Sequence, residues 1–295
     1  MSARRLAHAL LLAAVAMLLG ACMNATLTRL AYANGTLAYN NLGPVLTWMA
    51  DGYVDLNGTQ EDWVRARIAR ALSWHRAQEL PKYRGFLERA LAKTAEPFTA
   101  DDVEPFYREL RQHWRHMTEQ VIPDTAELLA GLDAEQATQL EKKFAEDDVK
   151  YARESLRGTP EERRRKRINR FSDHLQVWLG SLTDEQRALV AEHYRELPDL
   201  SDEVLGDRRY RQGEIVAMVR SNASKEDIAP KLRKLFVEPE TWRRPEYQEK
   251  LKARERKTFE MLAALSATLS AEQRAALQSR IRAFMKDIAN LTAAG

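Results

Sequence analysis

The feature that most constrains this chain is a five-residue pattern of Leu, three variable residues and Gln, which occurs four times. The copies are LNGTQ (56–60), LDAEQ (132–136), LTDEQ (182–186) and LSAEQ (269–273). In the last three copies a residue that caps helix N-termini follows the Leu, and the Gln stands three residues later. This is the spacing of a capping box, in which each of the two side chains bonds the other residue's backbone N–H. The pattern therefore predicts several separate helix starts.

The cap residues and their Gln partners follow copy by copy. We expect the pairs Asp133 with Gln136, Thr183 with Gln186, and Ser270 with Gln273. In the first copy, Thr59 or Asn57 would cap a helix that contains Gln60. Helix capping needs no ligand and is sufficient to explain these residues, and the alternative is that the motif is a functional element. The intervals between the Gln residues are unequal, which excludes a regular solenoid.

The rest of the sequence also favours helices. Long stretches are rich in Ala, Leu, Arg, Glu, Lys and Gln, and no run of alternating β-branched residues occurs. We therefore expect an all-α fold, either a multi-helix antiparallel bundle or stacked helical hairpins, because the connections are short. The expected helices are 45–54, 59–80, 82–93, 99–121, 133–156, 184–196, 201–220, 225–236, 240–266 and 271–291, with another that begins after Thr159.

Two prolines are expected to interrupt helices. Pro81 lacks a backbone N–H and clashes with the preceding turn, so we predict a kink or a short break there. Pro123 is expected to end the helix near Val121, and a short helix would follow up to Gly131. The helix after Thr159 carries an apolar seam with spacings typical of helix packing, formed by Ile168, Phe171, Leu175, Trp178 and Leu182.

The first residues predict export. Arg4 and Arg5 precede an apolar run, residues 9–19, that is typical of a secretory signal and too short for a stable membrane span. The sequence LGAC (19–22) resembles the lipobox of bacterial lipoproteins, which implies cleavage before Cys22 and its acylation, as with palmitate. Cys22 is the single cysteine of the chain, so no internal disulfide can form. The expected organisation is a signal peptide (1–21), a lipidated N-terminus and tether (22–44), and a helical periplasmic domain (45–295).

The residue after the cysteine is Met23 rather than Asp, which favours an outer-membrane lipoprotein whose soluble part faces the periplasm. The chain has 46 Lys and Arg residues against 43 Asp and Glu residues. This balance argues against nucleic acid as a partner, as does the expected location. The expected partners are the membrane, through the N-terminal lipid, and an envelope protein, while the oligomeric state is left open.

A longer resemblance spans most of residues 22–290. The stretches LAYNNLGPVLTWMADGYVDLNGTQ (37–60) and LSWHRAQELPKY (72–83), with the lipobox and the last LSAEQ, resemble a family of helical lipoproteins of Proteobacteria. The domain that this family shares has no assigned function. At the level of the motif alone, the L-T-x-x-Q copies resemble the Spy/CpxP-like periplasmic proteins, small helical hairpins that bind unfolded clients or sensor domains. These resemblances imply a helical, periplasm-facing lipoprotein and carry over no activity.

A polar and aromatic cluster is expected in the first third of the chain. His75 and Glu79 lie four residues apart on one helix face and could act as acid and base, with Asp55 nearby. No nucleophile or glycine-rich loop accompanies them, so a structural role is preferred. The other expected members are Tyr39, Asn40, Asn41, Trp48, Tyr53, Trp74, Arg76 and Tyr83.

Two further features carry charge or metal-ligand chemistry. His113 and His116 are three residues apart, but two His residues alone do not define a metal site, and an exposed helix face is expected for them. The run RRRKR (163–167) is expected to be solvated helix, with Glu161 pairing with Arg165 and Glu162 with Lys166. The alternative for this run is contact with anionic lipid head groups or an acidic client.

These observations assign no catalytic, cofactor-binding or metal-binding residue. The expected function is that of a membrane-anchored binding or interaction protein of the cell envelope, an adaptor or a chaperone-like protein. The alternative is an envelope-maintenance enzyme or a ligand-binding protein that uses the His75, Glu79 and Asp55 cluster.

Overall fold

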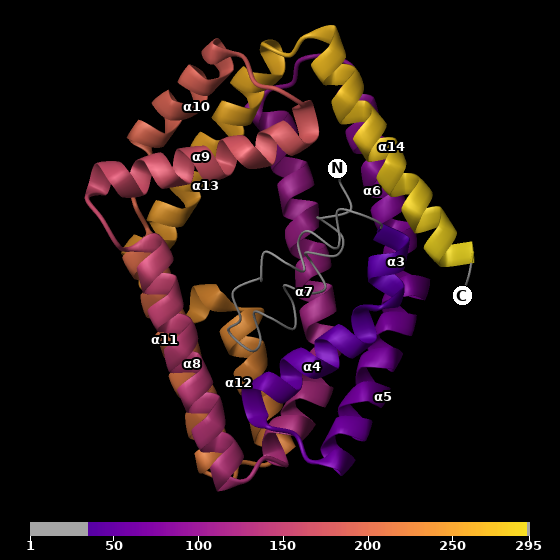
Figure 1. Cartoon of the computed structure of the whole chain (residues 1–295), viewed down its shortest axis with the longest axis vertical. Helices are drawn as coiled ribbons and strands as arrows, with labels where there is room; N and C mark the ends of the chain where they lie inside the picture. The colour runs from indigo at the N-terminus through magenta and orange to yellow at the C-terminus, as the bar shows by residue number, and fades with distance from the viewer. Residues whose placement is uncertain (1–34, 294–295) are drawn as a thin grey trace.

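The computed structural model describes residues 35–293, and within this range it contains helices and no strand. The all-α expectation is therefore confirmed (Figure 1). The signal segment and Cys22 lie outside the described residues, so the predictions made for them stay predictions. Among the described helices, none is both long enough and apolar enough to cross a membrane.

The helix bounds agree with most of the expected ranges. In chain order they are α3 (Gly35–Asn40), α4 (Leu42–Val54), α5 (Gly58–Trp74), the π-helical turn η1 (His75–Glu79), α6 (Leu80–Lys93), α7 (Ala100–Ala130), α8 (Ala134–Ser155), α9 (Pro160–Leu179), α10 (Asp184–Glu196), α11 (Ser201–Arg220), α12 (Lys225–Phe236), the 3₁₀ turn η2 (Pro239–Thr241), α13 (Pro245–Ala267) and α14 (Ala271–Ala293). The helix expected from residue 240 begins at Pro245 instead, because the residue before a proline is held in an extended conformation, as Arg244 is.

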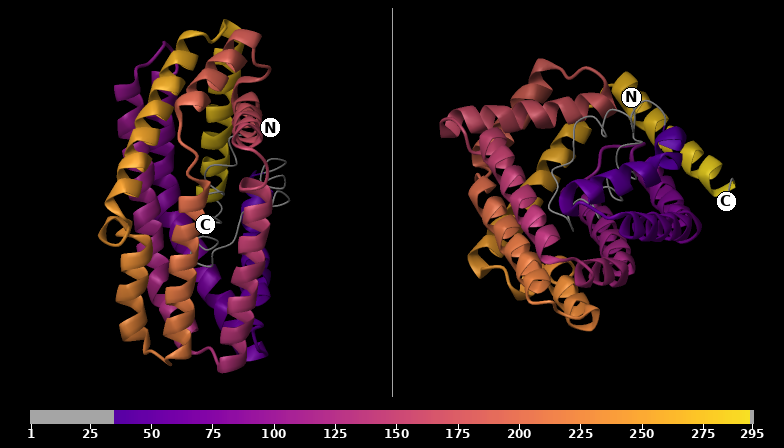
Figure 2. Two further views of the ribbon diagram at one scale, coloured as in Figure 1. Left: turned by 90° about the vertical axis from the view of Figure 1, so that its left-hand side faces the viewer. Right: turned by 60° about the horizontal axis from the view of Figure 1, so that its bottom comes forward.

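The helices run along the edges of an elongated frame (Figures 1 and 2). The long helix α7 contacts α12 and α13 along its length, and α8 and α11 pack together on the side opposite α6 and α14. At one end α10 packs on α9 and α13, and α14 also contacts α9. At the other end α4 packs against α5 and α8. The expected crossing of α4 over α5 is thus confirmed.

The prediction that Pro123 ends a helix is wrong, since α7 continues through it to Ala130. A proline removes one backbone hydrogen bond and strains the preceding turn. Tertiary packing offsets this penalty here: Ile122, Ala126 and Leu129 are buried in the same apolar core as Ile228 and Leu232 of α12. Burial of several such side chains, at about 1.5–3 kcal/mol each, outweighs the roughly 3 kcal/mol that an interior proline disfavours.

The apolar seam expected after Thr159 is confirmed. Ile168, Phe171 and Leu175 of α9 pack against a core formed by α10 and α13, which includes Val190 and Met261. The last part of the seam turns to α14, where the ring centroids of Trp178 and Phe284 lie 5.9 Å apart. One face of α9 therefore joins two different neighbours and closes one end of the frame.

Residues 35–44, which belong to the stretch expected as a tether, pack on the body. Tyr39 and Leu42 are buried in a core with Leu80 and Tyr83 of α6 and Ile288 of α14. The chain thus enters the helical body beside the turn that carries Glu79.

Candidate functional site

The candidate site is built on an irregular turn between α5 and α6. In η1 the backbone N–H of Leu80 bonds the carbonyl oxygen of His75, five residues back, as in a π-helix. Pro81 provides the physical reason, because its ring clashes with the preceding helical turn and one extra residue relieves the clash. The predicted break is therefore a π-helical bulge. It directs His75 and Glu79 into the protein, and both side chains are fully buried.

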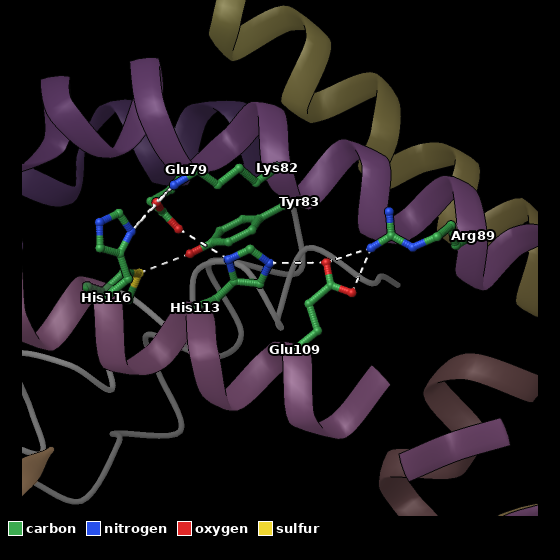
Figure 3. A network of polar contacts seen from close by, with 8 residues as sticks. Glu79, Lys82, Tyr83, Arg89, Glu109, His113 and His116 are labelled. Carbon is green, nitrogen blue, oxygen red and sulfur yellow. Dashed lines mark hydrogen bonds and ion pairs between the residues drawn. The ribbon is translucent and has the colours of Figure 1, made fainter. Parts of the chain in front are cut away.

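Three basic side chains surround the Glu79 carboxylate (Figure 3). The Nζ atom of Lys82 lies 2.6 Å from Oε1, and Nδ1 of His116 lies 2.7 Å from the same oxygen. Nδ1 of His113 lies 3.3 Å from Oε2. Burial raises the pKa of a carboxyl group, but hydrogen bonds from His113, Lys82 and His116 outweigh it and hold the pKa of Glu79 at about 2. Glu79 is therefore ionised at neutral pH.

A second layer of contacts fixes the orientation of His113. Its other ring nitrogen, Nε2, lies 3.6 Å from the carboxylate of Glu109, and Arg89 holds both oxygens of that carboxylate at 2.6 Å (Figure 3). The ring of Tyr83 meets His113 edge-on, with centroids 4.8 Å apart, and its hydroxyl contacts the sulfur of Met117 at 3.0 Å. Burial raises the pKa of the Tyr83 phenol well above its ordinary value. Tyr83 is thus neutral and positioned as a wall of the cluster.

The ring of His75 also meets that of Tyr83 edge-on, with ring centroids 5.5 Å apart. Its Nδ1 atom lies 2.9 Å from the hydroxyl oxygen of Tyr39, and that hydroxyl donates to the carbonyl oxygen of Leu72 at 3.1 Å. Burial raises the pKa of Tyr39 to about 12. Arg76 lies over the Tyr39 ring and donates to the side-chain oxygen of Asn40 at 3.1 Å. These contacts tie α3 to the π-helical turn.

Several residues expected in the cluster lie elsewhere. Trp48 is 67% exposed on α4, so its expected place in the cluster is wrong. Tyr53 is buried, but its hydroxyl donates to Asp147 of α8. Asp55 takes a left-handed conformation after α4 and is exposed, and the Asn41 side chain bonds only the carbonyl oxygen of Leu37 among the described residues. Tyr39, Asn40, Trp74, Arg76 and Tyr83 do gather around His75 and Glu79.

The main difference between the expected and the observed site lies in α7. His113 and His116 were expected on an exposed helix face. His116 is exposed as expected, but His113 is buried, and both rings bond Glu79. Their three-residue spacing placed them on one face of a helix, but no local signal connects that face with residue 79, 34 positions away. Among residues 35–293, no group of three or more His, Cys, Asp and Glu side chains is arranged to hold a metal ion.

The four Leu-x-x-x-Gln motifs all form capping boxes. Asp133 with Gln136 and Thr183 with Gln186 do so as expected, and Ser270 and Gln273 make the same two reciprocal bonds. In the first copy Asn57 is the cap and bonds Gln60, while Thr59 is an exposed residue of the first turn of α5. The capping interpretation is therefore confirmed, with Asn57 in place of Thr59.

The structure adds a relation that the sequence does not show: the motifs associate in pairs. The side-chain amides of Gln60 and Gln136 bond each other reciprocally, at 3.1 and 2.7 Å, across 76 residues of chain. Those of Gln186 and Gln273 do the same at 2.8 and 2.9 Å, across 87 residues. Each pair joins the starts of two helices that are distant in sequence.

Each Gln amide also donates to a backbone carbonyl of the opposite turn. The acceptors of the first pair are Gly131 and Asp55, and those of the second pair are Thr268 and Ser181. In every case the acceptor is two residues before the cap of the partner motif. Each pair thus has local two-fold symmetry, and Gln suits these positions because its amide supplies an acceptor oxygen and two N–H donors at once. The paired motifs therefore hold the N-terminal turns of two helices together.

Comparison with known proteins places the domain in a family but gives it no activity. No curated protein and no solved structure matches the chain. The model of a family described as a family of unknown function (DUF6279) matches residues 52–248. This range includes the π-helical turn, His113 and His116, and three of the four Gln residues. The chain belongs to this family of unknown function.

Proposed function

We propose that this protein is an outer-membrane lipoprotein that faces the periplasm and acts as a binding or interaction protein, as an adaptor or a chaperone-like protein would. The anchoring part of the proposal rests on the signal-like segment and the LGAC sequence that ends at Cys22. The described body begins at α3, 13 positions after that cysteine, which suits a short connection to the membrane.

The observation that carries the binding role is the exposure of Trp48. Its side chain is 67% exposed on α4, whereas the other aromatic residues of the expected cluster are buried or half-buried. Tryptophan is the residue type most enriched among those that dominate binding energy at protein interfaces. Exposure of an indole of this size to water is unfavourable, and contact with a partner protein would remove it from water. Trp48 is therefore our candidate anchor for an envelope partner.

The state of Glu79 favours binding over the enzymatic alternative. A general base needs a pKa near the working pH and a lone pair that a substrate can reach. The pKa of Glu79 is held at about 2, and Lys82, His113 and His116 occupy both oxygens of its buried carboxylate. Asp55, the third residue of the enzymatic alternative, is exposed and bonds Gln136 through its backbone. The cluster is therefore best explained as a structural element.

A site-specific photo-crosslinking experiment tests the interaction role. A photoreactive phenylalanine analogue would replace Trp48 in the acylated protein in its membrane, with Arg256, an exposed residue of α13, as the matched control position. We expect discrete adducts with one or a few envelope proteins at position 48 and not at position 256. Identical patterns at the two positions would overturn the assignment of α4 as a contact surface.

A further inference from the structure

A cleft of about 260 Å³ lies at the corner of the frame where α8 ends and where α9 and α11 begin. Tyr194 of α10 and Arg254 of α13 complete its lining. The part of α9 that lines it includes most of the basic run singled out in the sequence. The cleft lies on elements different from those that hold Glu79 and Trp48.

Basic side chains dominate this lining: Arg163, Lys166, Arg167, Arg170 and Arg254. Arg163 and Arg167 share one carboxylate, that of Asp199, at 2.9 and 2.7 Å. The only acidic residue of the lining is Glu154. Five cations against these two carboxylates leave an excess of three positive charges around a small volume. Like charges that share a site repel each other, so an anion in the cleft would relieve the repulsion.

The basic run does not form the local pairs expected from its sequence. Glu162 accepts from the backbone of Thr159 in the capping box of α9, and Lys166 donates to the carbonyl oxygen of Arg157 at 3.2 Å. No ion pair joins Glu161 with Arg165 or Glu162 with Lys166 in the described part of the chain, so these expectations are wrong. The acidic residues at the start of α9 therefore form no ion pair with the run, and Asp199 is the carboxylate that pairs with two of its arginines.

Two of the guanidinium groups are available to a ligand. Within residues 35–293, the side chains of Arg170 and Arg254 form no hydrogen bond and no ion pair. They line the cleft from different helices, α9 and α13, and the charges of both act on the buried phenol of Tyr194. An arginine presents paired N–H donors that match the oxygens of a phosphate or a carboxylate. Two unpaired arginines from different helices can therefore bind one anionic group together.

The cleft also has an apolar wall. Phe171 and Tyr194 pack with ring centroids 5.6 Å apart, and Leu200 and Val204 of the α10–α11 connection and α11 line the same space. A site that combines apolar walls with a few converging polar groups is typical of small-ligand binding. The combination favours a ligand that joins an anionic head to an apolar or ring-bearing body.

We propose that this cleft binds an organic phosphate, with Arg170 and Arg254 as the main phosphate contacts and Phe171 and Tyr194 against the apolar part of the ligand. Phosphate is favoured over a monocarboxylate because an excess of three positive charges matches a dianion better than a single charge. The phosphate could belong to a lipid head group or to a soluble phosphate ester, and both present the same chemistry. The proposal depends neither on a protein partner at Trp48 nor on the role of Glu79.

Calorimetric titration of the mature acylated chain in phosphatidylcholine nanodiscs tests the proposal, with phenyl phosphate as the probe. We expect saturable binding that weakens about tenfold or more in Arg170→Gln and in Arg254→Gln, because each change removes a charge-assisted contact. Arg256→Gln is the matched control, since it removes the same charge from the same helix outside the cleft. Neither cleft variant should lower the melting temperature, because neither guanidinium has a partner among the described residues to lose.

The source of the phosphate follows from a second arm, in which the nanodiscs also contain phosphatidic acid. Weaker apparent binding of phenyl phosphate by the unaltered chain would show that a lipid head group reaches the cleft. Unchanged binding would identify a soluble phosphate ester as the ligand class. The proposal is overturned if phenyl phosphate does not bind the unaltered chain, or if Arg254→Gln and Arg256→Gln weaken binding equally.

Discussion

Replacement of Glu79 by Gln removes one negative charge from the centre of three basic side chains and keeps the size of the side chain. The ordinary pKa of a Glu carboxyl is 4.5, and the contacts with Lys82, His113 and His116 hold that of Glu79 at about 2. A difference of about 2.5 units corresponds to roughly 3 kcal/mol of stability at neutral pH, at about 1.36 kcal/mol per unit. We therefore expect Glu79→Gln to lower the free energy of unfolding at pH 7 by about 3 kcal/mol.

The same pKa difference predicts a dependence on pH. The folded-state pKa of Glu79 is depressed, so its contribution is fully present above about pH 4.5 and is lost as the pH falls towards about 2. The difference in unfolding free energy between the unaltered chain and Glu79→Gln should therefore shrink over this window. Urea unfolding, followed by circular dichroism at a series of pH values, measures both quantities.

The matched control is Glu88→Gln, which breaks an exposed ion pair with Arg84 in the same helix, α6. Exposed pairs of this kind contribute about 0–1 kcal/mol, so the control should change stability little at any pH. If Glu79→Gln is as stable as Glu88→Gln, or if its deficit does not change between pH 4.5 and 2, the cluster does not stabilise the fold by the argued charge interactions.

Three further outcomes are expected. Cys22→Ser should stay unlipidated and uncleaved at this site, as measured by intact mass and membrane fractionation, and a mature-mass product in the outer membrane would contradict the lipoprotein proposal. Gln186→Glu should lower stability by about 1–3 kcal/mol, because its fully buried side chain loses both N–H donors. Thr183→Ala should lower stability by about 1 kcal/mol through the lost cap. Equal losses of the two variants in urea unfolding would argue against pairing of the motifs. His75→Ala should lower stability by about 1–3 kcal/mol, because it leaves a partner unpaired; a stable, folded variant that no longer gives the adducts at position 48 would show that the cluster takes part in function.

Local signals predicted the helices well because they act within one turn of chain. Each cap bonds a residue three positions away, so Asp133, Thr183 and Ser270 could be read as helix starts without knowledge of the fold. Pro81 and Pro123 show that local signals do not always determine the helix ends. Both raise the same local conflict, yet the chain inserts a π-helical turn before Pro81 and continues straight through Pro123. The packing of α12 along α7 decided the second case, and it lies more than 100 residues from Pro123 in sequence.

Side-chain environment was predicted less well than helix position, since burial depends on which helices meet. The sequence placed Trp48 in the polar and aromatic cluster, but α4 presents that side chain at the surface. It placed His113 and His116 on a solvated face, which holds for His116, but the Glu79 carboxylate of η1 meets both rings and His113 is buried. No feature within a few residues of these positions reports the approach of another helix.

The sequence by itself determined that the fold is all-α, where most helices begin, and that the Gln residues of three of the four motif copies close capping boxes. Only the tertiary structure decided that Gln60 pairs with Gln136 and Gln186 with Gln273, and that the basic run of α9 lines a cleft with Arg254. The physical reason is the range of the interactions. Capping is satisfied by neighbours along the chain, whereas the contacts of Glu79 with α7, the amide pairs and the cleft are formed by residues that packing brings together from 34 to 91 positions away.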